Sequence, residues 1–261
     1  MLNPVLTIAG SDCSGGSGLE ADLKTFTMHN TFGMAVVLGV YAVNTKGVYG
    51  ASVMSKDIVA AQFDAVFNDI RPLALKTGLM GDSDLIRLTI EKFKQYKPEN
   101  VVIDPVMFAK SGFRLISDED FKLYVSEFIQ FADVLTPNKM EAELLCGFEI
   151  DSKEKLKDAA KKLIDLGAKS VIAKGGKYFA EAVDYFYDGK DFHELFGKQL
   201  KTTNDHGAGC TLSAAIAANL ANGKSKLDAV KDAKLYTQNA IENAPNLGGG
   251  RGPLNHMFML K

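Results

Sequence analysis

The stretch with the clearest chemical potential runs from Thr203 to Thr211, reads TNDHGAGCT, and leads directly into an apolar segment, Leu212 to Leu220. Glycines at 207 and 209 permit a tight turn in which successive backbone N–H groups point to one spot. A helix that starts there adds unpaired amides and the positive end of its dipole, which together bind anions such as phosphate. Cys210 lies at the centre of this turn, where the same field is expected to lower the pKa of its thiol. The alternative is a glycine-rich loop before a core helix, with Cys210 as a small buried hydrophobic residue.

Further polar residues follow short apolar runs that are typical of buried strands. In a parallel sheet the carboxyl ends of the strands meet at one edge, where these residues are expected to gather. They are Asp12, Asp104, Asn138, Glu141 and Lys174. Carboxylates can hold Mg²⁺, a lysine can neutralise phosphate charge, and a helix N-terminus can stabilise a moving phosphoryl group. This combination indicates phosphoryl transfer.

Each of these residues also has a structural interpretation when it is taken alone. Asp104 precedes Pro105 and could be only a turn former, while Asn138 and Glu141 could be a helix cap with its first-turn acid. The loop from Gly10 to Gly18 has four glycines after a strand, which lets a ligand approach the backbone. Its spacing matches neither the dinucleotide-binding fingerprint nor the P-loop.

The elements that must position these residues alternate between strand and helix along the chain. The predicted strands are 5–9, 33–43, 48–53, 73–76, 101–103, 134–136, 170–173, 183–187 and 191–200, the last two as an antiparallel edge. The predicted helices are a segment with Leu19, Leu23 and Phe26 on one face, then 57–70, 84–96, 121–131, 140–145, 153–166, 212–220 and 227–242. This alternation predicts an α/β fold with a doubly wound, mostly parallel sheet and helices on both faces, in one domain over residues 1–261. Residues 248–261 are predicted to be a loose tail.

Composition excludes several classes of function. With 46% hydrophobic and 24% charged residues and a net charge of −2, the 261-residue chain gives no electrostatic reason to bind nucleic acid or an anionic membrane. Its longest apolar runs are too short to span a bilayer, and the N-terminus lacks a basic segment with a cleavage site, so a cytoplasmic location is expected. Cysteines at 13, 146 and 210 and four histidines show no zinc-ligand or disulfide spacing.

Several motifs, in order along almost the whole chain, resemble those of the hydroxymethylpyrimidine and phosphomethylpyrimidine kinases. They are TIAGSD at 7–12, SGGSG at 14–18, ADLKT at 21–25, VIDPVM at 102–107, KSG at 110–112, TPN at 136–138 with Glu141-Ala142, KGG at 174–176 and HGAGCT at 206–211. The resemblance implies a ribokinase-like three-layer αβα sandwich with a mostly parallel central sheet. It also implies an ATP- and Mg²⁺-dependent kinase that phosphorylates a small-molecule alcohol.

The resemblance assigns roles residue by residue. Cys210 matches the catalytic residue, whose place in most ribokinase-like enzymes is held by Asp, and Gly207, Ala208 and Gly209 match the anion hole. The implied ATP contacts are Asn138, Lys174, Gly175 and Thr211. The implied metal ligands are Asp104 and Glu141. The positions implied to line the substrate pocket are Gly10, Asp12, Ser17, Asp22, Val43, Leu79 and Val106. A lid over the site is implied at Lys110, Ser111 and Gly112. The family also suggests a homodimer.

One departure bears on the substrate. The pyrimidine kinases typically read Ala-Gln-Asn-Thr where this chain has Ala42-Val43-Asn44-Thr45, and Val43 cannot supply the hydrogen bond of that Gln to a pyrimidine ring. A related branch that phosphorylates pyridoxal, pyridoxine and pyridoxamine often has an apolar residue there. Some members of that branch carry a lid cysteine, which the sequence around Lys110 lacks. The pyrimidine is therefore the expected substrate, with the vitamin B6 compounds as the alternative.

Two other classes of function stay open. A thiol hydrolase could use Cys210 with His206, four residues away across the glycine turn, but then Asp104 and Lys174 have no role. A non-catalytic vitamin-binding sensor would not need Cys210 or the carboxylates.

Overall fold

The computed structural model describes residues 2–108, 115–179 and 182–260. Over these residues one sheet of nine strands has the order β3-β2-β1-β4-β5-β6-β7-β8-β9. The strands are β1 (Asn3–Asp12), β2 (Thr31–Asn44), β3 (Gly47–Val53), β4 (Ala74–Thr77), β5 (Val101–Ile103), β6 (Val134–Leu135), β7 (Val171–Lys174), β8 (Val183–Tyr187) and β9 (Phe192–Phe196). Strands β2, β1, β4, β5, β6 and β7 pair in parallel, and β3, β8 and β9 join as antiparallel edges.

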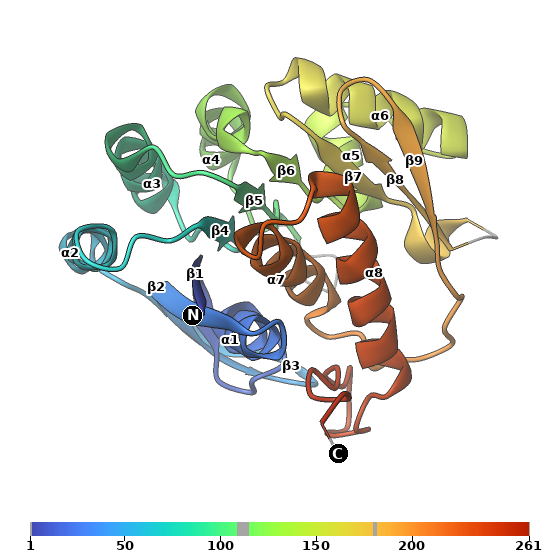
Figure 1. Cartoon of the computed structure of the whole chain (residues 1–261), viewed down its shortest axis with the longest axis horizontal. Helices are drawn as coiled ribbons and strands as arrows, with labels where there is room; N and C mark the ends of the chain where they lie inside the picture. The colour runs from blue at the N-terminus through green and yellow to red at the C-terminus, as the bar shows by residue number, and fades with distance from the viewer. Residues whose placement is uncertain (1, 109–114, 180–181, 261) are drawn as a thin grey trace.

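Helices cover both faces of this sheet (Figure 1). They are α1 (Gly18–Met28), α2 (Lys56–Phe67), α3 (Ser83–Tyr96), α4 (Asp118–Leu123), α5 (Lys139–Cys146), α6 (Lys153–Asp165), α7 (Ala208–Ala221) and α8 (Lys226–Glu242). One core layer joins the sheet to α1, α7 and α8, and the other joins it to α2 through α6. The predicted three-layer sandwich with a mostly parallel sheet is confirmed.

The inner strands read as continuous apolar runs because both of their faces are buried. In β5, Val101 and Ile103 pack on the α2–α6 side while Val102 packs on the α7 side. Helix α7 is buried from Thr211 to Ala221, and its many alanines let it lie close to the sheet between α1 and α8. The strand order reverses at β1, where β2 and β4 lie on opposite sides. Such a switch point leaves a crevice at the carboxyl edge of the sheet, where ligands bind in open α/β folds.

Three sequence predictions need correction or adjustment. The helix at the glycine turn begins at Ala208 rather than Leu212, so the predicted turn is already the first turn of α7. The predicted helix over 121–131 continues α4 as a π-helical turn (Tyr124–Phe128) and a 3₁₀ turn (Ile129–Phe131). The prediction of a loose tail is wrong, because Gly252, Leu254 and His256 are buried although the segment is irregular. Among the described helices, none is long and apolar enough to cross a membrane.

Candidate active site

The anion site is predicted at the first turn of α7, with the amides of Gly207, Ala208 and Gly209 as its donors; among residues 208–211, the amides that the structure leaves unbonded are those of Gly209 and Cys210. Gly207 caps the helix with φ of 86°, a left-handed conformation that favours glycine. The N–H of Ala208 donates to the Asp205 carbonyl at 3.2 Å, and the N–H of Thr211 donates to the Gly207 carbonyl at 2.8 Å. Among the described residues, no backbone carbonyl accepts from the two amides between them, those of Gly209 and Cys210. These amides are free to bind an anion at the positive end of the α7 dipole.

A second glycine-rich loop packs directly against this turn. A Cβ atom on Gly207 would lie 1.9 Å from the carbonyl oxygen of Gly16, and one on Gly16 would lie 2.4 Å from a ring carbon of His206. The absence of side chains at both positions therefore lets the N-terminus of α1 approach the N-terminus of α7. The loop that seemed uninformative from its spacing is a structural part of the anion site.

Asp104 and Lys174 lie over the free amides. The Lys174 Nζ is 3.6 Å from Asp104 Oδ1, and a Cβ on Gly209 would lie 3.5 Å from Asp104 Oδ2 and 3.7 Å from Lys174 Nζ. The buried Asp104 also accepts hydrogen bonds from Thr136 Oγ1 at 3.1 Å and Ser213 Oγ at 3.4 Å. A phosphate held by the Gly209 and Cys210 amides would thus meet one cation and one carboxylate. Of the residues predicted to gather at this edge, Asp104 and Lys174 thus lie together beside the turn.

Asn138 and Glu141 form the helix cap that the structural interpretation predicted. The Glu141 N–H donates to Asn138 Oδ1 at 3.1 Å, and the Asn138 N–H donates to Glu141 Oε2 at 2.8 Å. The Glu141 carboxyl is nonetheless buried, and burial together with nearby Asp104 raises its pKa to about 7 against the opposing effect of Lys174. A carboxyl that only caps a helix does not need to be buried. The burial of Glu141 therefore indicates a second role for this residue.

The donor set fits a magnesium ion carried by a nucleotide better than a metal held by protein alone. In the described part of the chain, no group of three or more histidine, cysteine or acidic side chains is arranged to hold a metal ion. Mg²⁺ commonly takes one or two carboxylates and completes its shell with phosphate oxygens and water. Asp104 and Glu141 are such a pair, and their mutual repulsion would be relieved by a cation.

A buried ion pair that the sequence analysis missed lies below Cys210. Lys76 of β4 donates from Nζ to both oxygens of Asp22 in α1, at 3.0 and 2.8 Å, and Thr7 Oγ1 donates to the same carboxylate at 2.6 Å. Lys76 and Asp22 have no exposed surface. Burial would lower the pKa of Lys76, but Asp22 and the neighbouring Cys210 and Asp104 raise it above its usual value, so Lys76 stays charged.

The predicted lowering of the Cys210 pKa is wrong. Burial raises the pKa of this thiol above its ordinary value. Lys76 lowers it, but Asp22 and Asp104 act in the opposite direction. The charge of one lysine therefore does not overcome burial and two nearby carboxylates.

Asp12 organises the loop after β1. Its carboxylate accepts hydrogen bonds from Ser14 Oγ and Ser17 Oγ, both at 2.7 Å, and lies 2.8 Å from His206 Nε2. Burial would raise the pKa of Asp12, but the hydrogen bonds from His206, Ser14 and Ser17 outweigh it and hold the pKa below its usual value. The Nε2 of His206 is thus directed to Asp12 and not to Cys210, which removes the main support for a thiol hydrolase.

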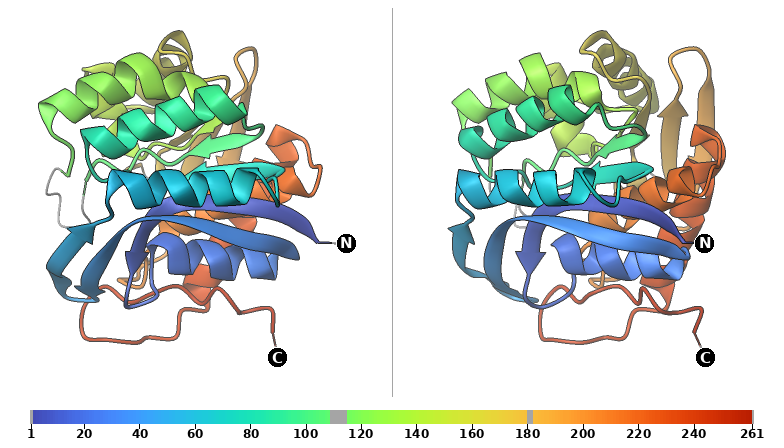
Figure 2. Two further views of the ribbon diagram at one scale, coloured as in Figure 1. Left: turned by 90° about the vertical axis from the view of Figure 1, so that its left-hand side faces the viewer. Right: turned by 60° about the vertical axis from the view of Figure 1, so that its left-hand side comes forward.

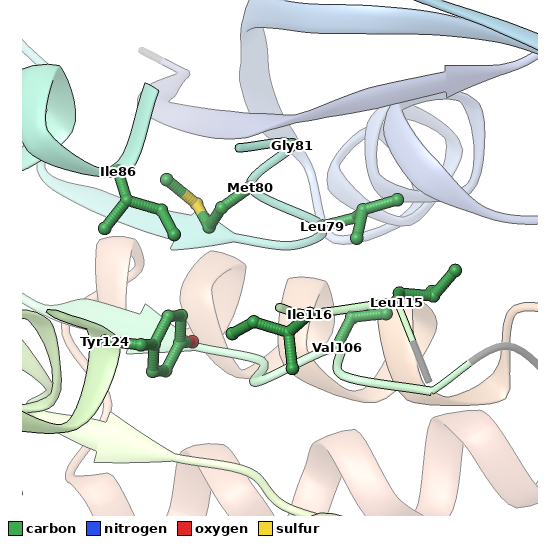
Figure 3. Close-up of a pocket in the computed structure, with 8 residues that line it drawn as sticks. All are labelled: Leu79, Met80, Gly81, Ile86, Val106, Leu115, Ile116 and Tyr124. Atoms are coloured by element: carbon green, nitrogen blue, oxygen red, sulfur yellow. The ribbon is translucent and has the colours of Figure 1, made fainter. Parts of the chain in front are cut away.

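Two of the seven residues predicted to line the substrate pocket line a cavity in the structure. Leu79 and Val106 line a cavity of about 20 Å³ between the loops after β4 and β5, shown with its other lining residues in Figure 3. Gly10 leaves room for the ring of Tyr41, since a Cβ there would lie 2.3 Å from Tyr41. Val43 is on β2, and its carbonyl accepts from Cys13 Sγ at 3.3 Å. The predicted lid, Lys110, Ser111 and Gly112, lies outside the described residues.

Fold and site together define the class of the protein: a small-molecule kinase with a ribokinase-like α/β sandwich and an anion site at a glycine-rich helix N-terminus. Within this class, the chain belongs to the phosphomethylpyrimidine kinase family, whose model matches residues 12–255.

Relatives with known names agree with this family. The hydroxymethylpyrimidine/phosphomethylpyrimidine kinase of Bacillus subtilis is 40% identical over 253 residues, covering 96% of this chain and 93% of that protein. The thiamine biosynthesis bifunctional protein ThiED of Geobacter sulfurreducens is 41% identical over 255 residues. That match covers 97% of this chain and 52% of the bifunctional protein, so the chain spans about half of its length. The ADP complex of Bacillus subtilis pyridoxal kinase has a TM-score of 0.94 and 35% identity, with 99% of both chains covered.

Proposed function

We propose that this protein transfers the γ-phosphoryl group of ATP to the hydroxymethyl group of 4-amino-5-hydroxymethyl-2-methylpyrimidine, and then to the resulting monophosphate, in thiamine biosynthesis. The observation that carries the proposal is the position of Asp104 and Lys174 directly over Gly209, beside the free amides of α7. An anion site, a cation and a carboxylate within contact distance are what stabilises a phosphoryl group in transfer.

The chain's own residues divide the work of the reaction as follows. The Gly209 and Cys210 amides and Lys174 hold the transferring phosphoryl group, with Asn138 and Gly175 completing the nucleotide contacts. Thr211, which the resemblance also assigns to ATP, is buried, and its N–H and hydroxyl both donate to the Gly207 carbonyl, so it supports the turn instead. Cys210 orients the substrate alcohol and accepts its proton as a thiolate, and Lys76 is the buried cation that offsets that charge. Asp104 and Glu141 would hold Mg²⁺, which neutralises phosphate charge when bound. Gly10, Asp12, Ser17, Asp22, Val43, Leu79 and Val106 are the proposed walls of the substrate pocket, and Lys110, Ser111 and Gly112 its proposed lid.

A second candidate substrate is a vitamin B6 alcohol. Val43 favours it, since valine offers no side-chain hydrogen bond to a pyrimidine ring. The pyridoxal kinase of Bacillus subtilis, which matches the whole fold, represents this related branch.

The decisive experiment measures ADP release by the purified protein with each alcohol separately: the hydroxymethylpyrimidine, its monophosphate, pyridoxal and pyridoxine. We expect turnover with the first two and weaker turnover with the others. Cys210→Ala and Lys174→Met should abolish most of it. Cys146→Ala is the matched control, because Cys146 is a partly buried thiol on α5, where its Sγ lies against the Ala159 carbonyl. ADP release that no alcohol stimulates would refute the proposal.

A cytoplasmic homodimer is the proposed state of the protein. The antiparallel edge formed by β2 and β3 exposes Val40, Val48, Tyr49 and Val53, and such an edge is normally covered in a stable assembly. Light scattering after gel filtration tests it, and a monomer at micromolar concentration would contradict it.

A further inference from the structure

The C-terminal segment from Gly248 to His256, here called the C-terminal strap, connects two parts of the site that are far apart in sequence. In Figure 2 the end of the chain runs as an irregular trace beneath α1 in both views. The strap has no regular secondary structure beyond a bridge between His206 and Pro253, yet Leu254 and His256 are each 3% exposed. A buried irregular segment needs specific partners for its polar groups.

One set of partners belongs to the loop that precedes the first turn of α7, residues 207–211, here called the anion turn. The guanidinium of Arg251 pairs with the Asp205 carboxylate, with Nε 2.9 Å from Oδ1. The next residue of the strap, Gly252, accepts a hydrogen bond from the His206 N–H at 3.1 Å. Asp205 in turn accepts the Ala208 N–H through its carbonyl. The strap therefore holds the residue that fixes the first amide of α7.

His256 contacts the anion turn through Thr211. Its Nε2 is 2.9 Å from Thr211 Oγ1, which is itself 2.9 Å from the Gly207 carbonyl. A threonine hydroxyl has one hydrogen, and a carbonyl can only accept. If Thr211 gives its hydrogen to Gly207, the Nε2 of His256 must be the donor to Thr211. All three groups are satisfied by this one arrangement, which fixes the Gly207 carbonyl and hence the plane of the Gly207–Ala208 peptide.

The first residues of the strap are attached to the turn between β2 and β3. The Gly250 N–H donates to Thr45 Oγ1 at 3.2 Å, and the Arg251 N–H donates to the Thr45 carbonyl at 2.8 Å. A Cβ on Gly250 would lie only 2.1 Å from that carbonyl oxygen, so the contact requires glycine. Thr45 is two residues from Val43, the proposed wall of the substrate pocket.

We propose that Arg251 and His256 are positioning residues for phosphoryl transfer, which hold the amides of the anion turn in register with the β2–β3 wall of the substrate pocket. Neither is proposed to touch the reacting atoms. Arg251 acts through Asp205, and His256 acts through Thr211. The inference rests on the proposed kinase function, because it assigns the turn to phosphate binding.

The test compares His256→Leu, His256→Gln and Arg251→Gln with the unaltered protein. Leucine removes the hydrogen bond to Thr211 while it keeps an apolar volume, and the amide of glutamine can replace the Nε2 donor. Loss of one such bond is expected to lower kcat about 3- to 10-fold, with the KM for the alcohol changed less than about twofold. His256→Gln should recover most of kcat. Lys224→Ala, which removes an exposed ion pair with Asp232 on α8, is the control and should leave kcat unchanged.

Hydrogen exchange separates this inference from the proposed function. The amides of residues 205–211 should exchange faster in His256→Leu and Arg251→Gln than in the unaltered protein, while the exchange of β4 and β5 stays the same. If no alcohol is phosphorylated, the kinase assignment fails and the exchange result still tests the strap. Equal kcat in the Leu and Gln variants, or unchanged exchange at 205–211, would overturn the positioning role. Should His256→Leu fail to fold, the partly exposed Arg251 still gives the kcat and exchange readouts.

Discussion

Lys76 and Asp22 form an ion pair at the centre of the molecule, with Lys76 Nζ 2.8 Å from Asp22 Oδ2 and neither side chain exposed. Strand β4 supplies the lysine and helix α1 the carboxylate, so the pair ties the sheet to the helix whose N-terminus faces the anion turn. Taking two charges out of water is costly, and well-packed apolar residues are often at least as stable. Stability alone therefore does not explain the pair, and both of its charges lie close enough to Cys210 to act on the pKa of its thiol, in opposite directions.

Removing one partner of this pair should be far more harmful than removing both. Lys76→Met leaves the Asp22 carboxylate buried without a cation and should lower the free energy of unfolding by about 3–5 kcal/mol. The double variant Lys76→Met, Asp22→Asn should recover much of that loss but not the activity. Urea denaturation followed by circular dichroism measures both effects. Equal destabilisation in the single and double variants would show that the two side chains do not interact.

Because the pKa of Cys210 is raised, the rate of the proposed phosphoryl transfer should increase with pH. Since only the thiolate accepts a proton, kcat should climb as pH rises from 7 through the ordinary thiol value of about 8.5. The alkylation rate of Cys210 with iodoacetamide should follow the same curve. The measurement uses a Cys13→Ala, Cys146→Ala background, in which Cys210 is the remaining thiol. A plateau of kcat and alkylation already at pH 7 would contradict the direction of this shift.

Asp104 should control the magnesium requirement. Replacing it with asparagine removes a charge from the proposed metal pair, so the Mg²⁺ concentration for half-maximal activity should rise about tenfold or more. Affinity for the alcohol without nucleotide should change little. Asp64→Asn is the matched control, because Asp64 pairs with Lys92 on the far helices α2 and α3. An unaltered magnesium dependence in Asp104→Asn would remove the residue from the metal site.

Val43 should set the choice between pyrimidine and pyridoxal. Val43→Gln offers a hydrogen bond to a pyrimidine ring, and such a bond is worth roughly 1–3 kcal/mol. The ratio of kcat/KM for hydroxymethylpyrimidine over that for pyridoxal should therefore rise by about 5- to 150-fold. Ile58→Gln, at an exposed position on α2, is the control. A ratio that falls in Val43→Gln would mean that this wall is assigned wrongly.

His256 should make stability depend on pH in a defined window. Burial, with a smaller contribution from Lys24, lowers its pKa from 6.5 to about 4, so between these values the unfolded chain binds a proton that the folded chain refuses. The contribution of His256 to the free energy of unfolding is complete above pH 6.5. It is lost as pH falls towards 4, and the total loss is about 3 kcal/mol. His256→Gln should show a shallower fall of the melting temperature over this window. His29, whose pKa is also lowered by burial, contributes with the same sign in both proteins.

The sequence was informative where chemistry and periodicity are local. The strands with two buried faces stand out as short apolar runs, and the anion turn combines glycine spacing, a cysteine and an apolar helix within a few residues. Asn138 and Glu141 are spaced for the cap that they form. The meeting of Asp104 with Lys174 follows from the rule that parallel strands end at one edge.

What could not be predicted depends on contacts across the chain. Lys76 lies within an apolar strand, where only a buried acid can stabilise it, but its partner is 54 residues away. A charged residue inside such a run was the available signal. The pKa of Cys210 needs the positions of Asp22 and Asp104, whereas the sequence shows only the helix start. The segment after α8 carries four glycines within residues 248–252, so its burial becomes visible only with the partners Thr45 and Thr211.

The attachment of the C-terminal strap has a consequence for how the protein is made. Residues 205–211 are synthesised before residues 251–256, so the anion turn leaves the ribosome without the groups that hold it. Synthesis proceeds at about 5–20 residues per second and a domain folds as a unit, so the sheet is covered on both faces only after α7 and α8 have emerged. The strap can bind Thr45 and Thr211 only afterwards. A ribosome-bound chain that has not yet released residues 251–256 should therefore lack the contacts that order the proposed catalytic turn, and it should be inactive.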